Sequence, residues 1–133
     1  MINVLFVSSE AVPFAKSGGL ADVAGTLPQK LDKNEVDIRL IMPKYGCIPQ
    51  EYVEKMQFIK AIEIPLGWRR QYCGIFELEH EGIKVYFIDN EFYFKRDNGL
   101  YGYYDDAERY VFFSRAVLEM LKYIQFKPQV INS

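Results

Sequence analysis

The chain has few of the residues that build metal sites, disulfide frameworks or histidine-based catalysis. Its 133 residues include two cysteines, Cys47 and Cys73, and one histidine, His80. The two cysteines have neither the spacing of metal ligands nor the density of a disulfide scaffold. We therefore expect no metal site, assign no cofactor, and place the protein in the reducing cytoplasm.

Long apolar runs and an excess of one charge are also missing. No stretch approaches the roughly 20 apolar residues that a membrane-spanning helix needs. The start, Met1-Ile2-Asn3, lacks the basic region of a secretion signal. The formal net charge of −2 gives no electrostatic basis for binding nucleic acid. We expect neither a membrane nor a nucleic-acid partner, and a neutral or modestly charged ligand fits better.

What remains is the composition of one soluble globular domain. Half of the residues are hydrophobic and 26% are charged, which is typical of a chain that buries a core. Aromatic residues make up 16%, and many lie between Trp68 and Phe126. Sugar-binding surfaces use aromatic faces, but cores use them more often, so packing is the first interpretation of each one.

The first third of the chain predicts a strand, a helix and a second strand. The apolar run from Ile2 to Val7 is typical of a parallel strand covered on both faces. Val36 to Met42, closed by Pro43, predicts another buried strand. Between them, apolar residues at helical spacing predict a buried helix face of Leu20, Val23, Ala24, Leu27 and Leu31.

Pro28 lies inside this helical pattern. It lacks the N–H that would bond to the Ala24 carbonyl, so we expect a kink or a shifted boundary, with Gly25 giving the distorted turn room. The whole unit is a right-handed βαβ crossover in a parallel sheet. Ligands of such sheets bind beyond the carboxyl ends of the strands, which is where the loop from Ser8 to Gly19 lies.

The middle of the chain predicts an antiparallel meander after an irregular stretch from Lys44 to Glu54. Its strands are expected at Gln57 to Leu66, Gln71 to Leu78 and Ile83 to Ile88, with turns around Gly67 and Gly82.

Asp89 to Tyr104 predicts a loop with a short helix. Asp105 could then cap a long helix, with Glu108 completing a capping box. Tyr110 to Ile124 follows a helical period, and the helix should end near Phe126-Lys127-Pro128. Gln129 to Asn132 predicts a final buried strand. Because such a strand normally leads into a functional loop, we expect the chain to be a piece cut just before that loop.

The stretch Lys16-Ser17-Gly18-Gly19-Leu20 is the clearest candidate for chemistry. It joins a predicted strand to a predicted helix, an arrangement in which backbone N–H groups can face an anion. Adjacent glycines let the backbone approach a ligand closely, and Lys16 adds a mobile positive charge. The pattern indicates a phosphate-bearing ligand.

These stretches together resemble the start of bacterial glycogen synthases and plant starch synthases, whose signature is Lys-x-Gly-Gly-Leu. The most specific match is Lys16 to Val23. The resemblance also includes Val7 to Glu10, Pro13-Phe14, Leu27-Pro28, Arg39 to Pro43, Leu100 to Gly102, Asp105 to Tyr110 and Pro128 to Ile131. It covers essentially the whole chain.

The resemblance implies an α/β fold that is part of a GT-B glycosyltransferase. Residues 1–133 would be a partial, Rossmann-like N-terminal domain with a mostly parallel sheet and an inserted antiparallel meander. The C-terminal nucleotide-binding domain would be absent. Such enzymes transfer glucose, with retention, from ADP-glucose to the non-reducing end of an α-1,4-glucan. ADP-glucose, the glucan acceptor and the missing C-terminal domain are therefore the implied partners.

The resemblance also implies site residues. Lys16 matches the family lysine that contacts the sugar nucleotide at its phosphates, and Gly18 and Gly19 match glycines whose backbone approaches the same group. Asp22 matches an acid near the site, or else is a first-turn charge favoured by the helix dipole. Tyr101 matches a tyrosine that lines the sugar pocket.

No catalytic residue is expected within the chain. In the family the closing strand leads into a His-Asp-Trp motif beside the transferred sugar, which would fall beyond Ser133, so the chain alone should be inactive. Asp105-Asp106 departs from the usual Asp-Asn of the family, and no role is carried over to that position. We expect Glu108 and Arg109 to form surface or interdomain salt bridges, and His80 to be a solvated turn residue.

A second hypothesis is a stand-alone, non-catalytic module that binds a nucleotide or a glycan, because the segment from Asp89 to Tyr104 is rich in aromatic residues. A flavodoxin-like or receiver-like domain is a weaker third, since those folds alternate strands and helices throughout.

Overall fold

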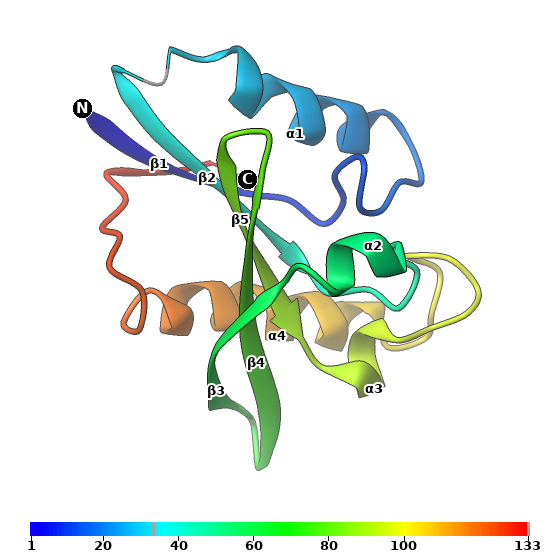
Figure 1. The fold of residues 1–133 in the computed structure, drawn as a ribbon. Helices are drawn as coiled ribbons and strands as arrows, with labels where there is room; N and C mark the ends of the chain where they lie inside the picture. Colours follow the sequence, from blue (N-terminus) through cyan, green and yellow to red (C-terminus); the bar gives the residue numbers. More distant parts are fainter. Residues whose placement is uncertain (33, 133) are drawn as a thin grey trace.

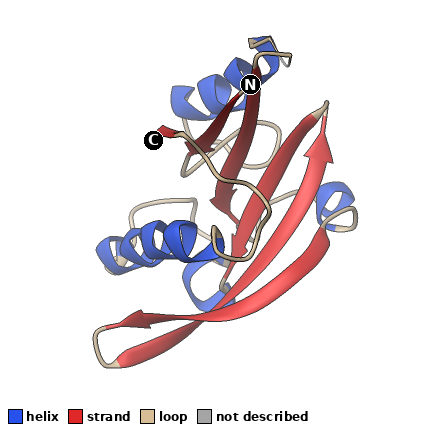
Figure 2. Cartoon of the chain, turned by 90° about the vertical axis from the view of Figure 1, so that its left-hand side faces the viewer, coloured by secondary structure: helices blue, strands red, loops and turns tan. Residues whose placement is uncertain are grey.

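The computed structural model describes residues 1–32 and 34–132. One six-stranded sheet with the order β3-β4-β5-β2-β1-β6 runs through the molecule (Figures 1 and 2). Its strands are β1 (Ile2–Val7), β2 (Val36–Pro43), β3 (Gln57–Leu66), β4 (Arg69–His80), β5 (Ile83–Asp89) and β6 (Val130–Asn132). The helices are α1 (Gly19–Lys30), α2 (Gln50–Val53), α3 (Glu91–Phe94) and α4 (Asp106–Met120).

The expected division of the sheet is confirmed. Strand β1 pairs in parallel with β2 and β6, and β2 pairs in parallel with β5. Strands β3, β4 and β5 form the antiparallel meander, whose β3–β4 hairpin extends well beyond the body of the molecule (Figure 2). The short helix α2 lies within the stretch that was expected to be irregular.

Helices lie on both faces of the twisted sheet. Leu40 on β2 and Val85 on β5 face α1, whereas Arg39, the neighbour of Leu40, stacks on Phe126 on the opposite side. Because successive strand side chains point to opposite faces, α1 and α4 must cover different sides of the sheet, as Figure 1 shows. The βαβ unit therefore places the loop between β1 and α1 at the carboxyl ends of the parallel strands.

The predicted buried face of α1 was wrong except at Ala24. Its buried residues are Ala21, Ala24 and Pro28. The large apolar side chains are between 36% and 51% exposed, namely Leu20, Val23, Leu27 and Leu31. The reason is close packing: a Cβ at Gly25 would lie 2.3 Å from the carbonyl oxygen of Val12. Gly25 is thus required by the loop that α1 packs against, rather than by Pro28.

The end of the chain also differs from expectation. Helix α4 ends at Met120, and residues 121–123 continue as turns. Strand β6 forms, but its three residues are exposed because, in the described part of the chain, it pairs with β1 alone. Burial of the final strand was therefore wrongly predicted.

Glu108 and Arg109 form salt bridges as expected, with Arg69 and Asp106, but the predicted capping box and the surface position of Arg109 were wrong. Asp105 precedes α4 but makes no capping hydrogen bond and pairs with Arg96, while Glu108 contacts Arg69 and Tyr93, so no capping box forms. Arg109 is fully buried rather than on the surface.

His80 closes β4 and is not a solvated turn residue. Its ring packs edge-on against the rings of Phe14 and Tyr52, at centroid distances of 5.3 Å and 5.6 Å. A partly buried aromatic contact therefore replaces the expected solvation.

Candidate functional site

The loop between β1 and α1 is a compact structure held by backbone hydrogen bonds. Ser8 N donates to the Ile41 carbonyl at 3.0 Å, which continues the parallel ladder one residue beyond β1. Val12 N donates to the Ala21 carbonyl at 3.0 Å and ties the loop to the first turn of α1. The loop thus presents the start of α1 at the carboxyl edge of the sheet, where ligands of parallel sheets bind.

A buried carboxylate, Glu10, lies at the centre of this loop and is only 2% exposed. Its Oε1 accepts hydrogen bonds from the backbone N–H groups of Ser17 (3.2 Å), Gly18 (3.0 Å) and Ala21 (3.2 Å). Its Oε2 accepts from Ser17 Oγ at 2.7 Å and from the Tyr101 hydroxyl at 2.5 Å. The N-terminal amides of α1 are therefore already bound to an anion that belongs to the chain itself.

Glu10 is held in its ionised form. Burial alone would raise its pKa, but the hydrogen bonds from Tyr101, Ser17 and Gly18 outweigh burial and bring the pKa below its usual range. The pKa of Tyr101 is raised by burial and by its hydrogen bond to Glu10, so its phenol stays protonated at neutral pH. Glu10 is thus a negative charge held in a helix N-terminus, where the dipole favours it.

Lys16 and Asp22 form an ion pair on the outer side of the loop. Lys16 Nζ lies 2.9 Å and 2.8 Å from the two carboxylate oxygens of Asp22. Both side chains are about half exposed. Exposed pairs of this kind contribute only about 0–1 kcal/mol, so Lys16 can leave Asp22 for a ligand at small cost.

Gly18 and Gly19 lie in open space. Nothing lies within 4 Å of the place where either would carry a Cβ, and Gly18 is in an extended conformation that any residue can adopt. The N–H of Gly18 is used by Glu10, whereas no hydrogen bond within the described residues uses the N–H of Gly19. The fold of this chain therefore does not itself require the two glycines. Of the two, Gly19 has the free backbone donor, and the N–H of Leu20 beside it is also unused within the described residues.

Tyr101 lies beside this loop although it is far away in the sequence. Its hydroxyl contacts Glu10 and lies 2.6 Å from Ser9 Oγ, and its side chain is partly exposed. The structure thus brings all five predicted site residues to one loop region around Glu10.

A buried polar network supports the loop that carries Tyr101. Arg109 donates to the carbonyl oxygens of Tyr93 (2.7 Å) and Leu100 (3.0 Å). Tyr110 also contacts the Leu100 carbonyl, and Tyr45 joins Tyr110 (2.8 Å) to the Ser9 carbonyl (2.6 Å). These contacts connect α4, the segment that follows β2 and the loop after β1.

The departure at Asp105-Asp106 has a structural role. Asp106 accepts hydrogen bonds from the backbone N–H groups of Gly102 (2.8 Å) and Tyr103 (3.2 Å) and pairs with Arg109. All of these contacts use a carboxylate oxygen as an acceptor, so an acid can fill the position where the family has an amide.

Sequence reasoning missed Glu10, Tyr45 and Arg109. Glu10 is the first charged residue after a buried strand, a position that points to the site edge. For Arg109 and Tyr45 no local signal was available, because both act on segments distant in sequence.

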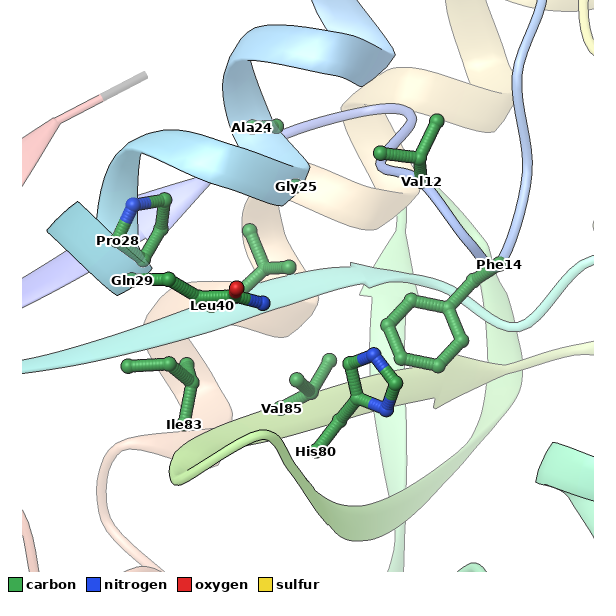
Figure 3. A pocket seen from close by; sticks show the side chains of 10 residues that line it. All are labelled: Val12, Phe14, Ala24, Gly25, Pro28, Gln29, Leu40, His80, Ile83 and Val85. Carbon is green, nitrogen blue, oxygen red and sulfur yellow. The ribbon is translucent and has the colours of Figure 1, made fainter.

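The apolar hollow in Figure 3 is a packing seam. It is lined by Val12, Phe14, Ala24, Gly25, Pro28, Gln29, Leu40, His80, Ile83 and Val85. Its cavity volume is about 10 Å³, which is room for a single water at most. None of the predicted site residues lines it, so the candidate site is the open loop surface and not this hollow.

The described residues offer neither of two other classes of site. No three His, Cys, Asp or Glu side chains there come together as a metal-binding group. No helix in residues 1–32 and 34–132 is long and apolar enough to cross a membrane.

Comparison with known proteins places this loop in a family context. A family model described as starch synthase catalytic domain matches residues 3–133. The chain is 60% identical to a glycogen synthase of Anoxybacillus flavithermus and 55% identical to one of Clostridium botulinum, each over 131 residues. In both cases the match covers 98% of this chain and 27% of the relative.

A solved structure has the same fold. The catalytic domain of starch synthase IV from Arabidopsis thaliana, bound to ADP and acarbose, superimposes with a TM-score of 0.85 at 31% identity. The match covers 98% of this chain and 27% of that structure. The chain thus spans about a quarter of the length of the relatives it matches.

Proposed function

Since the chain belongs to the family of starch synthase catalytic domains, we propose that it forms part of a longer glucosyltransferase. That enzyme transfers glucose from ADP-glucose to the non-reducing end of an α-1,4-glucan, with retention of configuration. Residues 1–133 supply one wall of the active site as part of an N-terminal domain. A C-terminal nucleotide-binding domain supplies the other wall, and the enzyme works in the cytoplasm.

One observation carries the proposal: Gly18 and Gly19 are open on the outer side of a loop that also presents Lys16. Neither glycine is needed by the contacts of this chain, since nothing lies within 4 Å of either Cβ position. Absence of a Cβ matters when a backbone must approach another group closely. A ligand at this surface would meet the free N–H of Gly19 and the ammonium of Lys16, which together suit a phosphate.

The chemistry of glucosyl transfer fits these donors. As the bond to glucose breaks, negative charge grows on the leaving diphosphate oxygen. A preoriented N–H and an ammonium stabilise that charge most strongly in the transition state, which is where binding accelerates a reaction. Lys16 exchanges the carboxylate of Asp22 for the diphosphate, and Asp22 keeps the lysine close to the site before the donor binds.

The first experiment is Lys16→Ala in the longer protein, assayed by incorporation of labelled glucose from ADP-glucose into glycogen. We expect a loss of about 100-fold or more in kcat, the usual size for a group that stabilises developing charge. Lys30→Ala is the matched control, because Lys30 is an exposed lysine at the other end of α1. Unchanged activity of Lys16→Ala would remove Lys16 from the site.

The donor and the stereochemistry are tested separately. ADP-glucose should support faster transfer than UDP-glucose at equal concentration, and NMR of the first product should show an α-1,4 linkage. A β-linked product, or a preference for UDP-glucose, would contradict that part of the proposal while leaving glucosyl transfer intact.

A stand-alone binding module is the second candidate. In its favour, Phe92 and Tyr104 in the aromatic-rich segment are exposed, with Tyr104 95% accessible. Calorimetry of the 133-residue chain with ADP-glucose, and separately with a malto-oligosaccharide, distinguishes the two. Sub-millimolar binding to the isolated chain favours the module, and no binding favours a half-site that needs a second domain.

A further inference from the structure

Glu10 is the one carboxylate that is buried among the described residues. It gathers five hydrogen bonds from Ser17, Gly18, Ala21 and Tyr101, so it joins the loop, the first turn of α1 and the segment around Tyr101. A buried charge persists only where such donors compensate for the loss of water. These contacts show that Glu10 fixes the arrangement of the backbone at the candidate site.

We propose that Glu10 is a positioning residue for the loop that meets the phosphates of the donor, an inference that rests on the function proposed above. Its carboxylate occupies the N–H groups of Ser17, Gly18 and Ala21. The donors left for the ligand are therefore the N–H groups of Gly19 and Leu20, which no hydrogen bond within the described residues uses, and the ammonium of Lys16. Glu10 decides which part of the helix terminus faces outward, and it touches no reacting atom itself.

A ligand phosphate does not replace Glu10 in this arrangement. Displacing the carboxylate would break its bonds to three backbone amides and two hydroxyls at once and leave a buried charge without partners. A phosphate would regain charge-assisted hydrogen bonds from the same amides, but the buried Glu10 carboxylate would be left uncompensated, and that loss has no counterpart when the phosphate uses other donors. The internal carboxylate and the external diphosphate therefore use different donors of the same helix terminus.

The same contacts define how Tyr101 acts. Ionised Glu10 can only accept, so the single proton of the Tyr101 hydroxyl is donated to Glu10, and Ser9 Oγ donates to Tyr101. The hydroxyl of Tyr101 is thus occupied on both sides, and its partly exposed ring remains for the ligand. Tyr101 meets the sugar through its ring face and supports the phosphate loop through Glu10.

The first test compares Glu10→Gln, Lys16→Ala and the double variant in the longer enzyme. We expect Glu10→Gln to lower kcat by about 10- to 100-fold, with the KM for the glucan acceptor unchanged. Because Glu10 acts through the loop that carries Lys16, the second substitution should add much less than its own single effect. Glu10→Asp, which keeps the charge, should recover part of the loss.

A merely structural role predicts a different pattern. Glu10→Gln would then lower the melting temperature but leave kcat per folded enzyme unchanged, and its effect would multiply with that of Lys16→Ala. An unchanged kcat per folded enzyme overturns the inference, and so does an effect on kcat that multiplies with that of Lys16→Ala. Glu119→Gln, at a partly exposed acid of α4 that pairs with Lys122, is the matched control and should change none of these quantities.

The second test uses the 133-residue chain and needs no enzyme activity. In an NMR pH titration, the amide protons of Ser17, Gly18 and Ala21 should shift together with the Glu10 carboxyl, at a pKa below the usual glutamate range. Tyr101→Phe should raise that pKa. The phenols of Tyr101, Tyr110 and Tyr45 also face this region, but they titrate far above the range in question.

The two tests separate the inference from the function on which it rests. If the chemical shifts of the three amides do not change as Glu10 titrates, the positioning role is wrong, whatever the activity of the enzyme. If they titrate with Glu10 but the longer protein transfers no glucose from ADP-glucose, the proposed function is wrong and the loop structure still stands. The amide of Gly67, in the distant β3–β4 turn, serves as the internal reference.

Discussion

At the scale of single residues, Gly25 and Gly19 show two different reasons for a glycine in one helix. A Cβ at Gly25 would lie 2.3 Å from the Val12 carbonyl oxygen and 2.4 Å from its side chain, so the loop and the helix could not keep their present distance. A Cβ at Gly19 would meet nothing within 4 Å. Only Gly25 is a requirement of the fold.

We therefore expect Gly25→Ala to lower the free energy of unfolding and Gly19→Ala to leave it unchanged or raise it slightly. The helix propensity of alanine favours both changes by up to about 1 kcal/mol, but overpacking at Gly25 costs about 1–3 kcal/mol or more. Urea denaturation of the chain measures both. Activity should show the opposite pattern to stability. In the longer enzyme, Gly19→Ala should reduce activity although it does not destabilise the chain. Equal stability of the two variants would contradict the close-approach explanation.

Single residues also show where sequence reasoning stops. Lys16 and the two glycines were predicted from a short local pattern, and the structure places them together at the expected edge. Glu10 was missed because its role depends on Tyr101, which is remote in the sequence and reaches it only in the folded chain. Arg109 was expected in a surface or interdomain salt bridge, whereas it is buried and donates to the carbonyl oxygens of Tyr93 in α3 and Leu100 in the following loop.

At the scale of elements, strands were more predictable than helix faces. Strands β1, β2, β3 and β5 closely match the expected ranges, since apolar runs bounded by glycine, proline or polar turns identify them. Helix α1 was located correctly, but its buried face was not. Periodicity favours the largest apolar side chains, whereas the close packing of α1 on the loop selects the smallest ones.

This corrected face of α1 gives a prediction for the isolated chain. Leu27→Gln replaces a partly exposed side chain, so the free energy of unfolding should change by no more than about 0.5 kcal/mol. Ala24→Leu enlarges a fully buried residue and should destabilise by about 1–3 kcal/mol. If Leu27 were buried, as the sequence pattern predicted, Leu27→Gln would instead lower the free energy of unfolding by about 2–5 kcal/mol. Denaturation of the Leu27→Gln variant decides between the faces, since Ala24 belongs to both, and Ala24→Leu shows the cost of a truly buried position.

At the scale of the whole molecule, the carboxyl edge of the sheet collects charged groups whose ionised forms the fold stabilises. Hydrogen bonds lower the pKa of Glu10 in the loop after β1, and arginine contacts and backbone donors lower those of Asp105 and Asp106 at the start of α4. Asp89 is the opposite case, because burial raises its pKa. Because three of these carboxyl groups have a lowered pKa and one has a raised pKa, we expect the fold to lose stability in acid.

The sign of the resulting pH dependence follows from proton binding. A carboxyl group with a lowered pKa in the folded state binds more protons when unfolded, so its contribution to stability is complete above the unfolded pKa and is lost as the pH falls through the folded pKa. We expect the melting temperature of the chain to fall steadily below about pH 4, near the usual range of these groups. Glu10→Gln should be less stable at neutral pH and should lose less on acidification, with the remaining slope due to Asp105 and Asp106. A pH profile parallel to that of the unchanged chain would show that Glu10 is no better stabilised in the fold than in the unfolded chain, and the ionised centre of the candidate site would have to be abandoned.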